Sequence, residues 1–237
     1  MAENLANLAK NLSQNDEKLR DKGEKTAPKI TLNNPQGFVL LISGPSGAGK
    51  STLLARLTSE FKDELYFSVS CTTRVAREGE VEGIDYHFIS ENAFKQGIER
   101  GEFLEYAFVH SNFYGTRARE AEQALNAGKV VIFDIDVQGF RQVRERLKGL
   151  LTSVFITTKS AKELENRLRK RASNDDIAKR LKNAKSEMKA LAEYDFFVIN
   201  EDLERAYAQL KSIFVAQKLR ISRYNAEQIS QLWTKGE

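Results

Sequence analysis

From residue 37 onward, short apolar runs alternate with segments whose apolar residues recur at helical spacing. The apolar runs occupy residues 38–42, 65–69, 130–135, 153–157 and 196–199. Each run has the length of a buried strand, and the helical segments between the runs supply the crossovers that parallel strands require. The pattern predicts an α/β fold in which a parallel sheet carries helices on both faces, with ligands bound at the carboxyl ends of its strands.

Three intervals depart from this rhythm. Residues from about 70 to 116 contain short β-like pieces and glycines, and we expect them to form an inserted mixed α/β subdomain. Residues from about 159 to 190 are helical and rich in charge, which suits a mobile lid. Residues 201–233 have the pattern of one long C-terminal helix. The core of the domain is then predicted to consist of residues 37–69, 117–158 and 191–237.

The N-terminal segment lacks the pattern of a core element. Leu5, Leu8 and Leu12 indicate a short amphipathic helix, but the residues after them are charged. We therefore predict a mobile tail over residues 1–36 and one domain over residues 37–237.

The composition is that of an ordinary globular protein, with 41% apolar and 30% charged residues. No apolar run approaches the roughly 18 residues of a membrane span, and the N-terminus lacks the apolar core of a secretion signal. We therefore expect a cytoplasmic protein without a membrane partner. The single cysteine, Cys71, excludes an internal disulfide and a multi-cysteine metal site. Neither His87 nor His110 has a partner at metal-ligand spacing.

Positive charge is concentrated in one segment. The chain carries a net charge of +4, but residues 159–189 alone hold eleven Lys or Arg residues against five Asp or Glu residues. A basic segment of this kind binds nucleic acid, closes over polyphosphate or forms a solvated helical face. This segment contains no aromatic side chain on which a base could stack, which disfavours nucleic acid as a partner.

The stretch GPSGAGKST at residues 44–52 predicts a phosphate-binding loop, because it completes the pattern G-x-x-x-x-G-K-[ST] between a predicted strand and a predicted helix. Its backbone N–H groups and the helix N-terminus favour an anion, the lysine reaches the outer phosphates, and the serine hydroxyl is a ligand for Mg²⁺. The motif predicts a nucleoside triphosphate and leaves the reaction open. Its candidate residues are Gly44, Pro45, Ser46, Gly47, Ala48, Gly49, Lys50, Ser51 and Thr52.

A pair of aspartates follows a second buried strand. In the run VVIFDID, Asp134 and Asp136 stand at the carboxyl end of the strand, where a carboxylate can hold Mg²⁺ or its water ligands. Helix capping is the alternative role for such aspartates. We take Ser51 and Asp134 as the candidate metal ligands.

A second phosphate site is indicated by the stretch SCTTRVAREGEVEGIDYHF at residues 70–88. Arg74 and Arg77 offer planar guanidinium forks, and Glu80 and Tyr86 follow them. Further along come FLEY at residues 103–106 and NFYGT at residues 112–116. Together with the phosphate-binding loop, these motifs resemble the guanylate kinase family over roughly residues 37–215, and they occur in the order typical of that family.

The resemblance implies the sites of two nucleotides. The S-x-T-T-R-x-x-R run and the tyrosine after it would hold the phosphate of GMP, and the glutamate of FLEY would read guanine. The implied GMP-binding residues are Ser70, Arg74, Arg77, Glu80, Tyr86, Glu105, Tyr114, Thr116 and Asp136. The lid arginines Arg167, Arg171 and Arg180 would close on the phosphates of ATP, and Asn200 would lie beside adenine. Lys50, Arg74, Arg171 and Arg180 would then be the catalytic residues.

The chain also departs from the family pattern. The lid between Arg171 and Arg180 looks shorter than is usual, residues 157–160 read TTKS where small residues and prolines are usual, and the tail before residue 37 has no counterpart.

Elementary chemistry supports GMP as the acceptor. Guanine presents N1–H and N2–H₂ as donors on one edge, so the Glu105 carboxylate can accept two parallel hydrogen bonds, whereas adenine would leave it unpaired. The expected enzyme is an ATP:GMP phosphotransferase that uses Mg²⁺, has ATP and GMP as its partners and is a monomer or a homodimer. Three alternatives stay open at this point: a kinase of another phosphate monoester, a non-catalytic protein-binding module of the same family, and a nucleic-acid-dependent ATPase.

Overall fold

The structure is a computed structural model that describes residues 35–109, 111–170 and 177–235. The segment predicted to be a mobile tail lies outside these ranges up to residue 34, and so do His110 and Arg171.

The centre of the molecule is a five-stranded sheet with the order β2-β7-β1-β8-β9, in which every pair is parallel. The strands are β1 (Phe38–Ser43), β2 (Leu65–Phe67), β7 (Val130–Asp134), β8 (Leu151–Thr157) and β9 (Phe196–Ile199). All five predicted strands are present. Strand β2 is shorter than predicted, because the chain turns toward a second sheet after Ser68, whose N–H makes a last bond to the Ile132 carbonyl.

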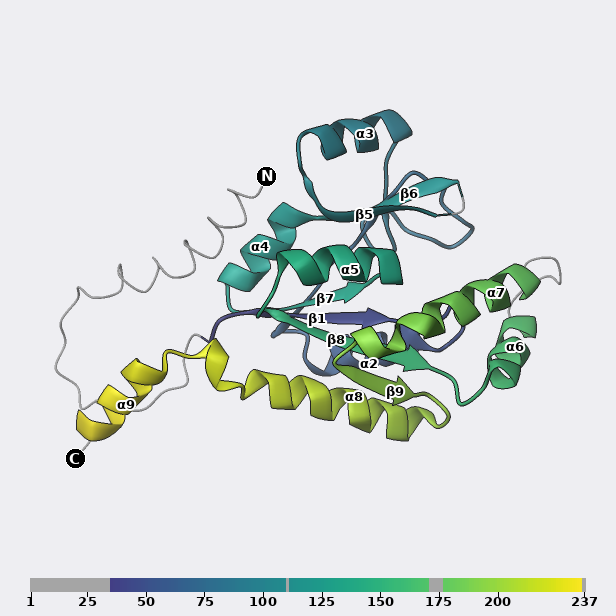
Figure 1. The fold of residues 1–237 in the computed structure, drawn as a ribbon. Helices are drawn as coiled ribbons and strands as arrows, with labels where there is room; N and C mark the ends of the chain where they lie inside the picture. Colours follow the sequence, from purple (N-terminus) through teal and green to yellow (C-terminus); the bar gives the residue numbers. More distant parts are fainter. Residues whose placement is uncertain (1–34, 110, 171–176, 236–237) are drawn as a thin grey trace.

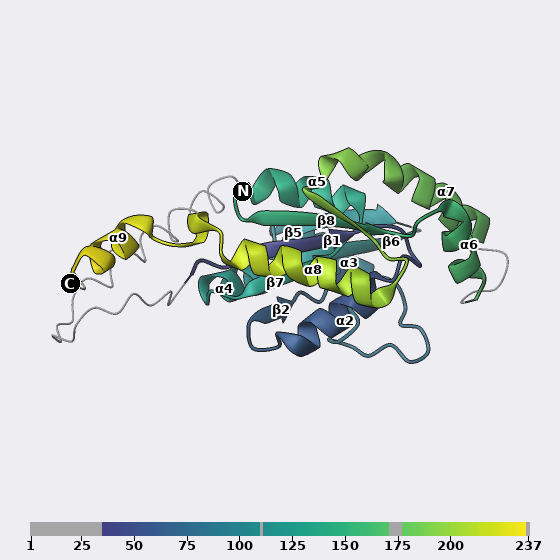
Figure 2. The same cartoon turned by 90° about the horizontal axis from the view of Figure 1, so that it is seen from below.

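Helices cover both faces of this sheet, as the sequence predicts (Figure 1 and Figure 2). On one face, α2 (Lys50–Glu60) and α8 (Leu203–Lys218) bury Leu53, Leu57 and Phe214. On the other face, α4 (Ala118–Asn126) and α5 (Val137–Arg146) bury Leu125 and Phe140. The three central strands β1, β7 and β8 are buried on both faces over nearly their whole length, which explains their continuous apolar runs. The edge strand β9 is an exception, because its Phe197 is 61% exposed.

A smaller mixed sheet with the order β4-β3-β6-β5 forms the inserted subdomain. Its elements are β3 (Cys71–Thr72), β4 (His87–Phe88), α3 (Glu91–Glu99), β5 (Phe103–Val109) and β6 (Asn112–Arg117). Its core is aromatic: the Phe94 ring stacks on Phe103 at 4.3 Å and on Phe113 at 5.2 Å between ring centroids, beside the buried Cys71. The predicted fold class is confirmed, and the residue boundaries of the subdomain stay a prediction.

The basic segment folds as helices α6 (Ala161–Arg169) and α7 (Ile177–Glu187), followed by a 3₁₀ segment η2 (Met188–Glu193). Leu164 and Leu168 of α6 pack against Ile177 and Ala184 of α7 in a small core of their own. These helices stand at one end of the molecule, across from the subdomain (Figure 1). The arrangement is that of a helical lid, with its charged side chains on the outside of a small apolar centre.

The prediction of one long C-terminal helix was wrong. Helix α8 ends at Lys218, a 3₁₀ turn η3 (Ile221–Arg223) follows, and α9 (Ala226–Lys235) begins a new direction away from the domain (Figure 1). The break contains neither Gly nor Pro, and two side-chain hydrogen bonds, one local and one long-range, hold the chain there. The Tyr224 hydroxyl donates to the Lys218 carbonyl at 2.6 Å, and Arg223 donates through Nε to the Gln36 carbonyl at 2.8 Å. Over the described ranges, no helix is both long and apolar enough to cross a membrane.

Candidate active site

The phosphate-binding loop joins β1 to α2 in a conformation that only glycines adopt easily. Gly44, Gly47 and Gly49 have φ values of 136°, 90° and 92°. At Gly44 the loop also passes so close to β8 that a Cβ atom would lie 1.9 Å from the Ile156 carbonyl oxygen. The first glycine of the motif is therefore required for two reasons. Its φ is unfavourable for other residues, and the neighbouring strand leaves no room for a Cβ atom.

The N-terminus of α2 is open to an anion. Gly49 caps the helix without a side-chain hydrogen bond, and the first turn contains no acidic residue, so the helix N–H groups keep their capacity to bind phosphate. The Lys50 ammonium donates to the Gly44 carbonyl at 2.7 Å and lies 3.8 Å from Oδ1 of Asp134. Burial raises the pKa of the Asp134 carboxyl and the Lys50 ammonium opposes this rise.

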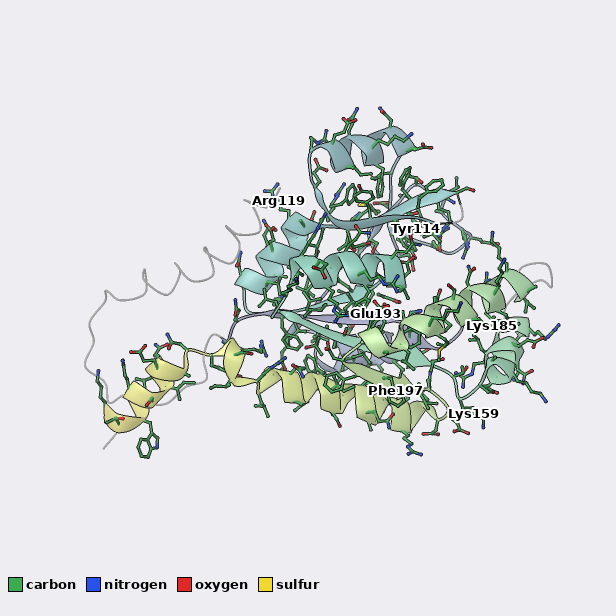
Figure 3. All side chains as sticks on the ribbon, viewed as in Figure 1. Tyr114, Arg119, Lys159, Lys185, Glu193 and Phe197 are labelled. Carbon is green, nitrogen blue, oxygen red and sulfur yellow. The ribbon has the colours of Figure 1, made fainter. Side chains whose placement is uncertain are left out.

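A cavity of about 440 Å³ joins this loop to the subdomain. It brings together most of the predicted site residues of both nucleotides: Gly44, Ser46, Gly47, Gly49, Lys50, Ser51, Thr52, Ser70, Arg74, Arg77, Glu80, Tyr86, Glu105, Tyr114, Asp134 and Asp136. Figure 3 labels Tyr114, which lines the cavity from the subdomain, and Lys185, which lies on α7. Residues from segments far apart in the sequence thus share one hollow at the carboxyl ends of β1 and β7.

One part of the cavity lining is cationic and aromatic. Arg74 makes a two-pronged bond to Glu80, with distances of 2.8 and 2.9 Å between guanidinium nitrogens and carboxylate oxygens. Glu80 also accepts from the Arg77 N–H at 2.8 Å, and these bonds hold the pKa of its carboxyl at about 2. The Arg74 guanidinium lies 5.3 Å from the centroid of the Tyr86 ring, which in turn meets the Tyr114 ring edge to face. The Arg74 fork is therefore held in place by a carboxylate, the group that most resembles a phosphate.

Another part of the cavity lining is a buried carboxylate. Glu105 of β5 is only 4% exposed, and its Oε1 accepts a 2.7 Å hydrogen bond from the Thr116 hydroxyl of β6. Burial raises the pKa of the Glu105 carboxyl to about 7, the Asp136 charge adds to this rise, and the Thr116 bond opposes it. Gly139 of α5 allows the close approach, because a Cβ atom there would lie 2.5 Å from Oε2 of Glu105.

Asp136 caps a helix, which is one of the two roles that the sequence left open for the aspartates of this run. Its Oδ1 accepts from the Gly139 N–H at 2.9 Å and caps α5, while the residue lines the cavity beside Glu105. Asp134 makes the contact to Lys50 described above.

A separate hollow lies on the other side of the loop, formed by Arg167, Asn200, Gly47, Gly49 and Thr52 with Lys170, Glu201 and Leu203. Asn200 is buried, and its side-chain amide donates to the Ala48 carbonyl at 2.9 Å. Arg167 donates to the Asn200 carbonyl at 2.8 Å and pairs with Glu163 at 2.9 Å. This hollow adjoins the phosphate-binding loop and extends from it to the C-terminal end of α6.

Four predicted residues of the described ranges do not line these two hollows: Pro45, Ala48, Thr116 and Arg180. Pro45 and Ala48 shape the loop through a 3.0 Å bond between the Ala48 N–H and the Pro45 carbonyl. Thr116 stands behind Glu105, and Arg180 belongs to α7.

The sequence did not single out Glu187, at the end of α7, which also lines the cavity. Its neighbours there include Ile135 and Val137, which flank Asp136, and Ala107 and Val109 of β5. Position gave the only available signal for these four, because Ile135 and Val137 adjoin Asp136, and Ala107 and Val109 follow Glu105 by two and four positions along the same strand. Glu187 had no such signal, since a glutamate in a charged helix is ordinary.

The described residues fit Mg²⁺ as a partner of the phosphates. Ser51 is exposed on the first turn of α2, and the Asp134 carboxylate stands at the end of the adjacent strand. No cluster of three or more His, Cys, Asp or Glu side chains in the described part of the chain forms a metal cage. Mg²⁺ does not need one, because it commonly takes one or two protein ligands and fills its shell with phosphate oxygens and water.

Comparisons with known proteins agree on one family. The family model described as Guanylate kinase matches residues 36–217. A guanylate kinase from Campylobacter jejuni is 54% identical over 204 residues, which cover 85% of this chain and 100% of the relative. One from Helicobacter pylori is 47% identical over 197 residues, covering 82% of this chain and 95% of the relative. The crystal structure of guanylate kinase from Anaplasma phagocytophilum matches with a TM-score of 0.67 at 32% identity, over 80% of this chain and 90% of that one.

Proposed function

Since the chain belongs to the guanylate kinase family and transfers a phosphoryl group from ATP to GMP, we propose that its cavity holds GMP between Glu105 and Arg74 while the phosphate-binding loop holds the phosphates of ATP. The observation that carries this assignment is that a buried carboxylate and a guanidinium fork share one cavity with the loop. A nucleoside monophosphate complements both groups, because its base can donate hydrogen bonds to the carboxylate and its phosphate dianion can pair with the guanidinium.

Guanine is read by Glu105. Oε1 is fixed by the Thr116 hydroxyl, and the ionised carboxylate accepts the N1–H and N2–H₂ donors of the base. Asp136, which lines the same end of the cavity, provides a further acceptor. Adenine places an acceptor at N1, so it would leave the buried carboxylate unsatisfied, and a mismatch of this type discriminates strongly.

The GMP phosphate is bound by Arg74, Arg77, Tyr86 and Tyr114, with Ser70 beside them. Arg74 exchanges the Glu80 carboxylate for phosphate oxygens, so its fork is oriented before GMP arrives. The second pKa of a phosphate monoester is roughly 6, so the attacking oxygen is already anionic at neutral pH. No general base is needed, and the site has to align two anionic phosphates and neutralise their repulsion.

Donor phosphates lie on the loop and on the N-terminus of α2. Lys50 exchanges its bond to the Gly44 carbonyl for oxygens of the transferring group, which carries developing charge in the transition state. Ser51 and Asp134 would hold Mg²⁺, which would supply positive charge to the phosphates of ATP.

Closure of the lid completes the proposed site. Helix α7 brings Arg180 and α6 brings Arg167 toward the donor phosphates, and Arg171, which lies outside the described residues, is assigned the same role from the family resemblance. Asn200 and the hollow beside it would take the adenine end of ATP. A cytoplasmic location, a monomeric or homodimeric state and the absence of nucleic acid and membrane partners stay predictions.

The assignment is tested by a coupled assay of ADP release with GMP, AMP, CMP, UMP and ribose 1,5-bisphosphate as acceptors. We expect strong turnover with GMP alone. Comparable turnover with ribose 1,5-bisphosphate would show that the base is not read, and would contradict the roles given to Glu105 and Thr116.

A further inference from the structure

Glu187 brings an unused hydrogen-bond acceptor into the cavity. The side chain lines the cavity from the C-terminal end of α7, and its Oε2 atom is shielded from solvent and has no hydrogen-bond partner among the described residues. A buried carboxylate oxygen without a donor lowers the stability of the fold, because it loses its hydrogen bonds to water and gains none in return. Such a cost is tolerated where a ligand supplies the missing donor.

The other carboxylates that line this cavity are already engaged. Glu80 is held by Arg74, and Asp134 lies 3.8 Å from the Lys50 ammonium. Glu105 accepts from Thr116, and Asp136 caps α5. Among the acidic residues that line the cavity, Glu187 is thus the one with a buried oxygen that has no donor.

The proposed placement of GMP in the cavity identifies a donor for the Glu187 oxygen. The inference rests on the proposed placement of GMP, with its base at Glu105 and its phosphate at Arg74. The sugar must then lie between these ends, and its hydroxyl groups are the donors of the nucleotide that still lack an acceptor. We propose that Glu187 accepts a hydrogen bond from a ribose hydroxyl of GMP and thereby links the acceptor nucleotide to the lid.

The sugar of ATP is a poorer match for Glu187. The hollow assigned to adenosine is formed by Asn200, Arg167 and the outer side of the loop, and Glu187 does not line it. Glu187 shares its hollow with Asp136, whose negative charge acts on it together with the positive charge of Lys50. Its cavity is the one that contains Glu105 and Arg74, the residues proposed to hold GMP, together with the phosphate-binding loop.

The position of Glu187 explains what the bond would do. It is the last residue of α7, seven positions after Arg180, so about 10 Å of helix separates the two. The next segment, η2, is fixed to α5 by Glu193, which accepts from Nε of Arg141 at 2.9 Å. A ribose bond at Glu187 therefore acts where the lid helix joins the fixed part of the domain, and binding of GMP would favour the position of α7 that brings Arg180 to the phosphates.

The test compares GMP with 2′-deoxy-GMP and 3′-deoxy-GMP in the wild-type enzyme and in Glu187→Ala. The wild type should prefer GMP to at least one deoxy analogue by roughly 10- to 100-fold in kcat/KM, the effect of one hydrogen bond to a charged group. Glu187→Ala should lose that factor with GMP, keep the wild-type value with the same analogue, and bring the ratio of the two close to one. The KM for ATP should not change.

Two further variants exclude a merely structural effect. Glu187→Gln keeps the shape and one acceptor oxygen, so it should retain part of the preference for GMP. Glu165→Ala removes a glutamate from the exposed side of α6 and should leave the preference intact. Calorimetric titration of GMP without ATP should show the same loss of affinity in Glu187→Ala, and a melting temperature at or above that of the wild type would show that the fold is kept.

Three outcomes would overturn the inference. The first is a wild type that uses all three acceptors equally, and the second is a Glu187→Ala enzyme whose preference is unchanged. The third is an equal loss of kcat with every acceptor, which would mean that Glu187 acts on Lys50 and not on the sugar. A wild type with no activity on GMP at all would instead contradict the placement of GMP itself.

Discussion

The Thr116 hydroxyl donates to Oε1 of Glu105 at 2.7 Å, and both side chains are buried. This bond turns a mobile carboxylate into a fixed one and leaves Oε2 beside the backbone of Gly139. Because the two strands that carry the pair, β5 and β6, are neighbours in the sheet, the orientation is set before any nucleotide binds. The cost is that a carboxylate sits in a poorly hydrated place, which raises its pKa to about 7.

The first prediction concerns pH and GMP binding. Guanine requires the ionised form of Glu105, whose pKa is about 7, so the affinity for GMP should rise with pH through neutrality. Between pH 6 and pH 8 the ionised fraction changes by about tenfold, and the dissociation constant should fall by a similar factor. Calorimetry at three pH values measures this. Glu105→Gln serves as the control, because its remaining pH dependence comes from the GMP phosphate; equal slopes in the two proteins would contradict the prediction.

The second prediction concerns pH and stability. The folded-state pKa of Glu105 lies above its unfolded value, so its contribution to stability is fully present below the unfolded pKa and is lost as the pH rises through about 7. Glu105→Gln has no charge to bury. Its melting temperature relative to the wild type should therefore increase between pH 5 and pH 8 in the absence of nucleotides. A difference that stays constant over this range would show that the carboxyl is not destabilised by burial.

The third prediction concerns Lys50. Lys50→Ala should lower kcat by about 100-fold or more, because it removes the cation placed at the transferring phosphate. Binding of GMP should be nearly unchanged, since the acceptor is held by other residues. Lys62→Ala removes an exposed lysine just after α2 and is the matched control. Near-normal turnover by Lys50→Ala, measured with saturating ATP and GMP, would show that the donor phosphates do not depend on this side chain.

The fourth prediction concerns the N-terminal segment. A chain shortened to begin at Pro35 should keep the activity and the melting temperature of the full chain, whereas one that begins at Gly37 should melt a few degrees lower. The reason is Gln36, whose N–H donates to the Arg223 carbonyl and whose carbonyl accepts from Arg223, both at 2.8 Å. Loss of two partly buried hydrogen bonds costs roughly 1 to 3 kcal/mol, and thermal unfolding of the three chains compares them directly. Equal melting temperatures for the two shortened chains would show that these bonds contribute nothing.

The sequence predicted the parts of the protein that depend on local chemistry. The loop at Gly44 to Ser51 needs glycines for its backbone and a lysine for the phosphates, so its function is readable from residue types alone. The three central strands β1, β7 and β8 were predictable for a similar reason, because a strand buried on both faces must be continuously apolar. The identity of the acceptor came from the family resemblance, with Glu105 as the residue that gives it a physical basis.

Features that depend on contacts between distant segments were not predictable. The break after α8 follows from bonds made by Arg223 and Tyr224, neither of which is a helix breaker. The hydrogen bond from the Asn200 side chain to the Ala48 carbonyl joins residues that are 152 positions apart in the sequence. Glu187 is one of several charged residues on α7, and only the fold shows that its carboxylate enters the cavity. In each case the residue type is common, and its structural role is determined by the residue that it contacts in the folded protein.

The central claim is that Glu105 identifies the acceptor base, and Glu105→Gln tests it. The substitution keeps the size of the side chain but replaces one acceptor oxygen with an NH₂ donor, which then faces a donor of guanine. Loss of a charge-assisted bond and the new mismatch together cost roughly 2 to 5 kcal/mol, or about 30- to several-thousand-fold in kcat/KM for GMP.

The decisive measurement is therefore kcat/KM for GMP and for AMP in the wild type and in Glu105→Gln at saturating ATP. We expect the preference for GMP over AMP to narrow mainly through loss of activity on GMP, with the KM for ATP unchanged. A Glu105→Gln enzyme with the wild-type kcat/KM for GMP would contradict the account, because the base would then be read elsewhere.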